Sequence, residues 1–175
     1  RKRAADLVAQ MTLHEKVSQM LSWAPAIERL GIPAYNWWSE GIHGVGRAGT
    51  ATVFPQAIGM AAAFDEDMME QVGNAVGVEA RGKYNMCRAH GDRDIFKGLT
   101  VWAPNINIFR DPRWGRGHET YGEDPFLTSR LGVRFVEGMQ GDDPDYLQAA
   151  ACAKHFAVHS GPESDRLHFN AIVSK

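Results

Sequence analysis

The chain has 175 residues, and its 19 basic and 21 acidic side chains leave a formal net charge of −2. A charge this close to zero gives no strong field for a polyanion, so we expect neither nucleic acid nor an anionic membrane surface as a partner. The 44% hydrophobic and 10% aromatic content is that of a globular protein that buries an ordinary single-domain core, and no apolar stretch approaches a membrane-spanning length.

The first predicted elements are two short helices and an aromatic run. Thr12 and Glu15 have the spacing of a capping box, so a helix is expected to begin there and to end before Pro25. The apolar residues of the first helix are Ala4, Leu7, Val8 and Met11, and the second helix is expected to bury Val17, Met20 and Leu21. After Gly31-Ile32-Pro33, the aromatic run 35–38 is suited to the end of a strand.

The middle of the chain predicts a long helix after a glycine-rich loop at 41–52. Asp65 is placed to cap this helix, and apolar residues recur behind it at helical spacing, so Met68 and Met69 are expected in the core. The helix contains Gly73, Gly77 and Gly82, each of which costs about 1 kcal/mol relative to alanine at an exposed position. Close packing against a strand would explain them.

The last third predicts strand, helix and strand. The run 99–103 is a strand ended by Pro104, Asp124-Pro125 begins a helix that ends before Gly141, and a further strand runs from Ala149 into Lys154-His155. Uniformly apolar strands that alternate with helices are typical of an α/β protein with a parallel sheet. The nineteen-residue loop 105–123 follows a strand, as the active-site loops of a (β/α)8 barrel do.

Cysteine and histidine usage bounds the metal and disulfide chemistry. Cys87 and Cys152 allow one bridge at most, which excludes a disulfide framework or a thiolate metal cluster. His155 and His159 are four residues apart, but Gly161-Pro162 close behind argues against a helix that would put them on one face. We therefore expect no metal ion and no cofactor.

The start of the chain gives no compartment. The charged residues 1–6 are not followed by the apolar stretch of a signal peptide, and the chain does not begin with methionine. We expect a mature or cropped chain. Two cysteines do not distinguish the cytoplasm from the periplasm, and the oligomeric state is equally open.

The strongest candidate for a functional site is Lys154-His155, where a buried strand ends. An ammonium and an imidazole side by side can donate hydrogen bonds to neighbouring hydroxyls of one sugar ring. Taken alone, such a pair is more often a solvated turn.

Two further segments carry candidate binding residues. The loop 105–123 contains three arginines spaced three residues apart. One of them could bind substrate while the others pair with Asp111, Glu119 or Asp124. The alternative is that all three only rigidify the loop. Glu40 follows two tryptophans at 37 and 38, a combination that suits the hydroxyls and the apolar face of a sugar. The alternative is that the tryptophans belong to the core and Glu40 to the surface.

Five segments in register resemble the N-terminal domain of glycoside hydrolase family 3. They are Met11-Thr12-Leu13-His14-Glu15-Lys16, Trp38-Ser39-Glu40-Gly41-Ile42-His43-Gly44, Ala103-Pro104-Asn105-Ile106-Asn107, Pro112-Arg113-Trp114-Gly115-Arg116-Gly117-His118-Glu119 and Lys154-His155-Phe156-Ala157. The resemblance covers essentially the whole chain. It implies the N-terminal portion of a TIM-like (β/α)8 barrel, with about three βα units and an N-terminal helical segment, as one incomplete domain over residues 1–175.

The resemblance also implies a retaining, exo-acting β-glycosidase that binds a terminal sugar. The residues that match the family's glycone contacts are Glu40, Arg116, Lys154 and His155, and Arg166 matches another arginine of the xylosidase-like members. Glutamate at position 40, where glucosidase members usually have aspartate, and a bulky aromatic at Trp102 are similar to the β-xylosidase branch. The longer carboxylate and the indole would fill the space of a hexose hydroxymethyl group, so we expect a β-xylosidase first, with arabinosidase or glucosidase activity next.

The same resemblance places the catalytic groups elsewhere. The family nucleophile is an aspartate in a Ser-Asp-Trp-like or Ser-Asp-Cys-like motif well downstream, and the acid/base comes from a later domain or loop, so both are expected beyond Lys175. Asp165 follows a serine but lies too close to Lys154-His155 for the nucleophile. We expect the chain to need the rest of its own polypeptide and to have no turnover alone. A noncatalytic carbohydrate-binding or scaffold fragment is the first alternative, and a phosphate-binding isomerase, for which no glycine-rich phosphate loop is evident, is the last.

Overall fold

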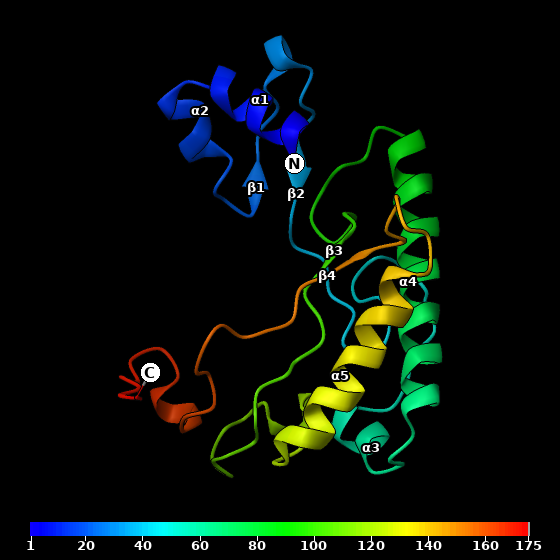
Figure 1. Ribbon diagram of the computed structural model, residues 1–175, viewed down its shortest axis with the longest axis vertical. Helices are drawn as coiled ribbons and strands as arrows, with labels where there is room; N and C mark the ends of the chain where they lie inside the picture. The colour runs from blue at the N-terminus through cyan, green and yellow to red at the C-terminus, as the bar shows by residue number, and fades with distance from the viewer. Residues whose placement is uncertain (175) are drawn as a thin grey trace.

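The computed structural model describes residues 1–174, in which helices and short strands alternate along the chain (Figure 1). The helices are α1 (Lys2–Gln10), α2 (Leu13–Ser18), α3 (Ala57–Ala61), α4 (Glu66–Ala89) and α5 (Pro125–Gln140), with 3₁₀ turns at η1 (Glu28–Leu30), η2 (Gly117–Glu119) and η3 (Glu163–Asp165). The strands are β1 (Trp23–Ala24), β2 (Tyr35–Asn36), β3 (Thr100–Val101) and β4 (Ala150–Ala151).

Helix starts follow the predicted capping residues. The side chain of Asp65 accepts a hydrogen bond from the backbone N–H of Met68 at 2.9 Å, and that of Asp124 accepts one from Leu127 at 2.6 Å ahead of α5. Thr12 and Glu15 form the expected capping box of α2. These predictions from local sequence are confirmed, because a cap satisfies backbone donors that the helix itself leaves unpaired.

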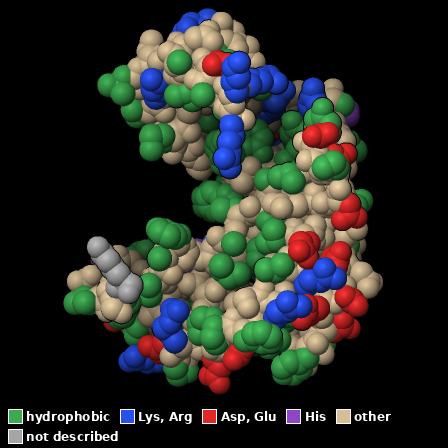
Figure 2. Space-filling model, viewed as in Figure 1, with side chains coloured by type: hydrophobic (Ala, Val, Ile, Leu, Met, Phe, Trp, Pro, Cys, Tyr) green, Lys and Arg blue, Asp and Glu red, His purple; other side chains and the backbone are tan. Residues whose placement is uncertain are grey.

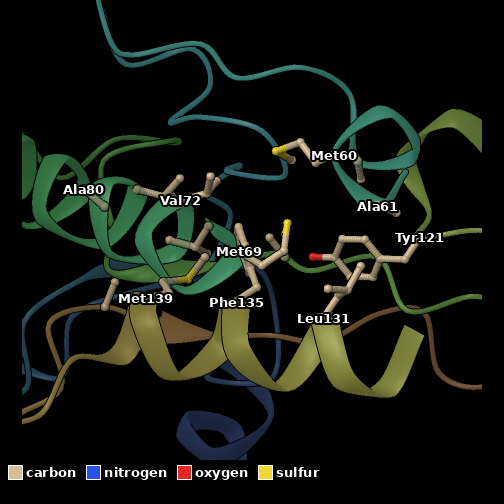
Figure 3. Packing of buried hydrophobic residues seen from close by; sticks show 14 residues of the cluster. Met60, Ala61, Met69, Val72, Ala80, Tyr121, Leu131, Phe135 and Met139 are labelled. Atoms are coloured by element: carbon tan, nitrogen blue, oxygen red, sulfur yellow. The ribbon is translucent and has the colours of Figure 1, made fainter. Parts of the chain in front are cut away.

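The core lies between α4 and α5, which run side by side in the same direction (Figure 1). Figure 3 shows apolar side chains of α3 and α4 meeting those of α5 and Tyr121. The core residues with no exposed surface are Met69, Ala103, Leu131, Phe135 and Met139. Met69 is therefore a core residue as predicted, and Met68 packs against the core from its edge.

Two glycines allow the close approach of these helices. A Cβ added at Gly73 would lie 2.3 Å from the carbonyl oxygen of Phe135, and one at Gly138 would lie 2.0 Å from that of Glu70. Both distances are far below any real van der Waals contact. The prediction that close packing explains the α4 glycines is confirmed at Gly73 and Gly77, but the partner is α5 and not a strand; Gly82 faces open space.

The parallel sheet is narrower than the sequence predicts. Strand β3 pairs with β4 in parallel, Thr100 opposite Ala150 and Val101 opposite Ala151, so the predicted strands 99–103 and 149–155 shrink to two paired residues each. A parallel bridge from Ser39 to Val101 adds a third chain segment beside β3, and one from Asn105 to Lys154 continues the pairing of the β3 and β4 segments. The α/β class is confirmed, with three chain segments aligned in parallel.

The N-terminal region departs most from the predictions. Strand β2 pairs with β1 antiparallel and lies outside the parallel sheet, and neither β1 nor α3 was predicted. The predicted burial of Val17, Met20 and Leu21 is wrong, since these residues are 57%, 84% and 63% exposed. Helix α2 ends at Ser18, and an apolar pattern buries its residues only where another element packs against them.

The surface is uneven in shape and in charge. Figure 2 shows a hollow between the N-terminal helices and the C-terminal segment, with hydrophobic side chains gathered in it, and a mixed-charge face over α4 and α5. Arg130 pairs with Glu66 and Arg134 with Glu137 on that face. Neither Cys87 nor Cys152 is paired within residues 1–174, and no helix in that range is both long and apolar enough to span a membrane.

Candidate functional site

The predicted sugar-binding residues meet at one end of the parallel segments. Glu40 follows the bridge of Ser39 to Val101, and Lys154 bridges Asn105, so both side chains leave the sheet at the same edge. With Arg116 they line a polar cavity of about 260 Å³. Its remaining walls come from Gly41, Ile42, His43, Gly44, Gly46, Gln56, His118 and Glu119.

Arg116 is held by a carboxylate on its own 3₁₀ turn. Its Nε and Nη2 donate to the two carboxylate oxygens of Glu119 at 2.7 and 2.6 Å, a bidentate pair. Burial is the largest influence and raises the pKa of Glu119, but the hydrogen bonds and charge of Arg116, together with Asn105 and Lys154, lower the pKa overall. The pair therefore stays ionised at neutral pH and fixes the plane of the guanidinium.

His155 has protein partners at both ring nitrogens. Its Nδ1 lies 2.7 Å from Oδ1 of Asn107, and its Nε2 lies 3.2 Å from Nη1 of Arg116. Burial, followed by the positive charges of Arg116 and Lys154, lowers the pKa of His155 to about 4. The imidazole is thus neutral at pH 7, and it is not the free pair of donors that the sequence suggested.

Lys154 supplies a cation to the cavity wall. Burial and then the charge of Arg116 lower its pKa, whereas Glu119 and Glu40 act in the opposite direction. An ammonium group has three donors and no acceptor, so it can bind only lone pairs, such as those of sugar hydroxyls. The peptide bond between Lys154 and His155 is cis.

Glu40 is positioned by an indole and by a loop. Trp38 Nε1 donates to its Oε1 at 3.1 Å, and Arg47 Nε lies 3.7 Å from its Oε2. Trp38 in turn stacks on Trp102, with ring centroids 4.8 Å apart and planes at 15°. The indoles beside the carboxylate are therefore those of Trp38 and Trp102, and not of Trp37 and Trp38 as the sequence predicts. Trp37 packs edge-on against Tyr35, and Trp38 remains 37% exposed.

The loop that carries Arg47 is anchored to α4. Lys83 Nζ donates to the carbonyl oxygen of Ala48 at 3.0 Å, and the carboxylate of Glu79 accepts from the backbone N–H of Thr52 at 3.0 Å. At Gly44, where φ is +129°, a Cβ would lie 2.2 Å from the carbonyl oxygen of Thr52, so the loop requires glycine there.

Of the sequence-predicted site residues, His155, Arg166 and Trp102 do not line the cavity. Arg166 Nη1 lies 3.2 Å from Oε1 of Glu163, whose other oxygen accepts from the backbone N–H of Gly115. Trp102 reaches Glu40 only through Trp38. The structure thus groups Glu40, Arg116 and Lys154 around one cavity, with His155 behind Arg116.

The other arginines of the long loop have structural partners. Arg113 makes a bidentate pair with Asp111, and Arg110 donates to the hydroxyl of Ser160. Asp124 caps α5 and pairs with no arginine among residues 1–174. Arg113 and Arg110 therefore rigidify the loop, whereas Arg116 lines the cavity, and substrate binding by Arg116 stays a prediction.

Two asparagines near the site were not predicted. Asn105 and Asn107 are only 1% and 4% exposed, and both touch residues of the site. The sequence pattern could have indicated them. Two polar residues at alternate positions directly after an apolar strand share one face, and when they are buried their side chains need hydrogen-bond partners there. Residues 1–174 contain no group of three or more histidine, cysteine or acidic side chains arranged to hold a metal ion.

Comparisons with known proteins give matches along nearly the whole chain. The sequence model of the Glycosyl hydrolase family 3 N terminal domain matches residues 4–171. A Xylan 1,4-beta-xylosidase of Xylanibacter ruminicola is 51% identical over 169 residues, which are 95% of this chain and 20% of that protein. Probable beta-D-xylosidase 7 of Arabidopsis thaliana is 50% identical, over 99% of this chain and 24% of that protein.

Solved structures are also similar over most of the chain. A GH3 exo-beta-xylosidase (XlnD), in complex with a xylobiose aziridine activity based probe, superposes with a TM-score of 0.81 at 37% identity, over 94% of this chain and 22% of that one. DesR, a beta-glucosidase from Streptomyces venezuelae in complex with D-glucose, superposes with a TM-score of 0.76 at 33% identity, over 99% of this chain and 21% of that one. The chain thus spans between a fifth and a quarter of the length of these proteins.

Proposed function

The chain belongs to glycosyl hydrolase family 3, and from this premise we propose that it supplies the glycone-binding part of a retaining, exo-acting β-glycosidase. Its fold is the N-terminal portion of a TIM-like (β/α)8 barrel. In the proposed enzyme the chain holds a terminal β-linked sugar, while the nucleophile and the acid/base come from outside residues 1–175.

The observation that carries the proposal is the ring of charged groups around the 260 Å³ cavity. The carboxylate of Glu40 accepts hydrogen bonds, whereas the guanidinium of Arg116 and the ammonium of Lys154 donate them. Neighbouring hydroxyls of one sugar can therefore be bound both as donors and as acceptors. A volume just below the range of drug-sized ligands suits a single sugar ring.

Xylose is the favoured glycone and glucose is the next. The similar proteins support both, since xylosidases are prominent among the relatives and glucosidases among the solved structures. The stacked indoles of Trp38 and Trp102 add bulk beside Glu40, where a hexose would need space for its hydroxymethyl group. Exclusion of this kind is worth about 1–3 kcal/mol, which gives preference but not exclusivity.

The proposal assigns binding and not bond cleavage to this chain. Retaining hydrolysis needs two carboxyl groups about 5–5.5 Å apart across the scissile bond. Glu40 already accepts from Trp38 and faces Arg47, an arrangement that suits a hydrogen-bonding role, and Asp165 is exposed on η3. The apolar side chains exposed on α2 and after Phe156 fit a chain that packs against further parts of its polypeptide.

The test measures hydrolysis of aryl β-xyloside and aryl β-glucoside by the full polypeptide that carries this chain. We expect a higher kcat/KM for the xyloside and a loss of at least 100-fold in Glu40→Gln, because a charged acceptor for a sugar hydroxyl is removed. Asp145→Asn, which neutralises an exposed carboxylate in a turn, is the matched control and should retain full activity. Equal activity of Glu40→Gln and the control would overturn the assignment.

The alternative function is sugar binding without chemistry. It predicts that xylose binds to the polypeptide with an affinity that depends on Glu40, while no aryl glycoside is hydrolysed. Calorimetry with xylose, run on the same proteins as the hydrolysis assay, separates the two functions.

A further inference from the structure

The orientation of the Asn107 side chain follows from its contact with a backbone donor. Its Oδ1 position lies 3.0 Å from the backbone nitrogen of His155 and 2.7 Å from Nδ1 of the same residue. A backbone N–H can only donate, so the atom that faces it must be the amide oxygen and not the NH₂ group. The same oxygen faces Nδ1, and Nδ1 must therefore carry a hydrogen.

The remaining ring nitrogen is then an acceptor. When Nδ1 of a neutral imidazole is protonated, Nε2 has a free lone pair. That lone pair faces Nη1 of Arg116 at 3.2 Å, and a guanidinium can only donate. The contact from Arg116 thus agrees with the tautomer set by Asn107.

We infer that Asn107 is a positioning residue that fixes His155 as the neutral tautomer with hydrogen on Nδ1, so that Nε2 accepts a hydrogen bond at the sugar site. That the site binds a sugar rests on the proposed function. The tautomer of His155 is inferred from the protein contacts alone. Because Nε2 has a single lone pair, the donor that it serves is Nη1 of Arg116, and Lys154 is the neighbouring group left to donate to hydroxyl lone pairs.

Asn107 is itself held in place. Its backbone N–H donates to Oδ1 of Asn105 at 3.0 Å, and Nδ2 of Asn105 lies 3.4 Å from Oε2 of Glu119. Both asparagines are buried, so their amides have little freedom to turn. Glu119 therefore aligns Arg116 directly and contributes to the alignment of His155 through the two asparagines.

An uncharged partner matters because cations surround the imidazole. Arg116 and Lys154 act on His155 with their positive charges, the ring centroid of His159 lies 4.5 Å from that of His155, and the charge of Glu119 acts in the opposite direction. These cations, together with burial, disfavour the imidazolium. An amide oxygen orients the ring without adding a charge, whereas a carboxylate in its place would stabilise the imidazolium.

The test uses Asn107→Asp and Asn107→Leu in the full polypeptide, with histidine nitrogens labelled with ¹⁵N. Two-bond correlations distinguish hydrogen on Nδ1 from hydrogen on Nε2, and His155→Gln assigns the signals. We expect the unaltered protein to show hydrogen on Nδ1, Asn107→Leu to lose this preference, and Asn107→Asp to keep it while raising the pH of imidazolium formation by about one unit or more. Asn74→Asp, an exposed asparagine on α4, is the charge control and should shift nothing.

The pH dependence of xylose affinity separates the proposed sugar-binding function from the inference on the His155 tautomer. Binding should stay level between pH 8 and 5 in the unaltered protein, and the acid loss should begin at higher pH in Asn107→Asp. Absence of xylose binding in all variants counts against the proposed function, while the nitrogen shifts still report the tautomer. Hydrogen on Nε2 in the unaltered protein would overturn the inference, and so would ¹⁵N shifts over pH in Asn107→Asp that are identical to those of the unaltered protein. Asn107→Asp keeps an oxygen that can accept both hydrogen bonds from His155, so this variant still tests the inference if Asn107→Leu does not fold.

Discussion

Arg116 and Glu119 are joined by two hydrogen bonds of 2.7 and 2.6 Å within a single 3₁₀ turn. Three donors of the guanidinium are thereby used inside the protein, two by Glu119 and one by His155. The orientation of Arg116 is set before any sugar arrives, which lowers the ordering cost of binding.

Glu119→Gln should therefore weaken glycone binding although Glu119 is not the predicted contact. The neutral amide can accept one of the two bonds at most, so Arg116 turns more freely and the proposed site loses its fixed donor. We expect kcat/KM for an aryl β-xyloside to fall about 10- to 100-fold, as for other residues that hold a binding group from behind. Glu123→Gln, an exposed carboxylate four residues along the chain, is the matched control and should leave kcat/KM unchanged.

The stability of the chain should fall in mild acid because of His155. Its pKa is about 4 in the folded protein against 6.5 for the free side chain, since burial and the charge of Arg116 disfavour the imidazolium. As the pH falls from 6.5 towards 4, the unfolded chain takes up a proton that the folded chain does not, and the free energy of unfolding decreases. One proton limits this slope to about 1.4 kcal/mol per pH unit.

Urea unfolding midpoints at pH 7 and pH 5 measure this effect. His155→Gln should show a smaller drop between the two pH values than the unaltered protein. His14→Gln, at an exposed position on α2, should show the full drop. The pKa of His159 is also lowered, so part of the drop should persist in His155→Gln. An equal drop in all three proteins would contradict the assignment to His155.

The helix pair α4 and α5 should tolerate alanine at one glycine and not at another. Gly73→Ala places a methyl group 2.3 Å from the carbonyl oxygen of Phe135, so the helices must move apart, at a cost of about 2–3 kcal/mol or more. Gly82→Ala meets nothing within 4 Å on the same helix and should raise the free energy of unfolding by up to about 1 kcal/mol. Chemical denaturation of both variants checks the opposite signs, and destabilisation of both would show that helix propensity does not govern position 82.

Local patterns predicted the parts of the fold that local chemistry determines. The caps at Asp65 and Asp124 and the burial of Met69 follow from residues close in sequence. The burial expected for Val17 failed because an apolar residue is buried only by a partner, and the sequence pattern does not say whether one packs there. The short parallel strands have the same cause, since pairing depends on segments about fifty residues apart.

The sequence predicted the residues of the candidate site better than the hydrogen bonds between them. Residue types and motifs singled out Glu40, Arg116 and Lys154, which the fold brings to one cavity. The hydrogen bonds from His155 to Asn107 and to Arg116 span 48 and 39 residues, and no spacing in the sequence encodes them. Contacts of this kind also changed the expected role of His155 from donor to acceptor.

The stack of Trp38 on Trp102 gives a test of the pentose preference. Trp102→Ala removes the ring that lies 4.8 Å from Trp38, which opens space beside Glu40 and leaves the indole that hydrogen-bonds this carboxylate. If that space is the one a hexose hydroxymethyl group needs, activity on an aryl β-glucoside relative to the β-xyloside should rise about 10-fold. This corresponds to about 1.4 kcal/mol and lies within the roughly 1–3 kcal/mol that such steric discrimination supplies.

The matched control is Trp37→Ala, because Trp37 is 44% exposed and packs edge-on against Tyr35, away from the stacked pair. It should leave the ratio of the two activities unchanged. A general loss of activity on both substrates in Trp102→Ala, with a constant ratio, would mean that the stack only holds Trp38 and Glu40 in place. A rise in the ratio, with kcat/KM for the xyloside lowered less than for Glu40→Gln, would instead assign Trp102 to substrate selection, because steric exclusion changes the comparison between sugars and loss of a shared contact does not.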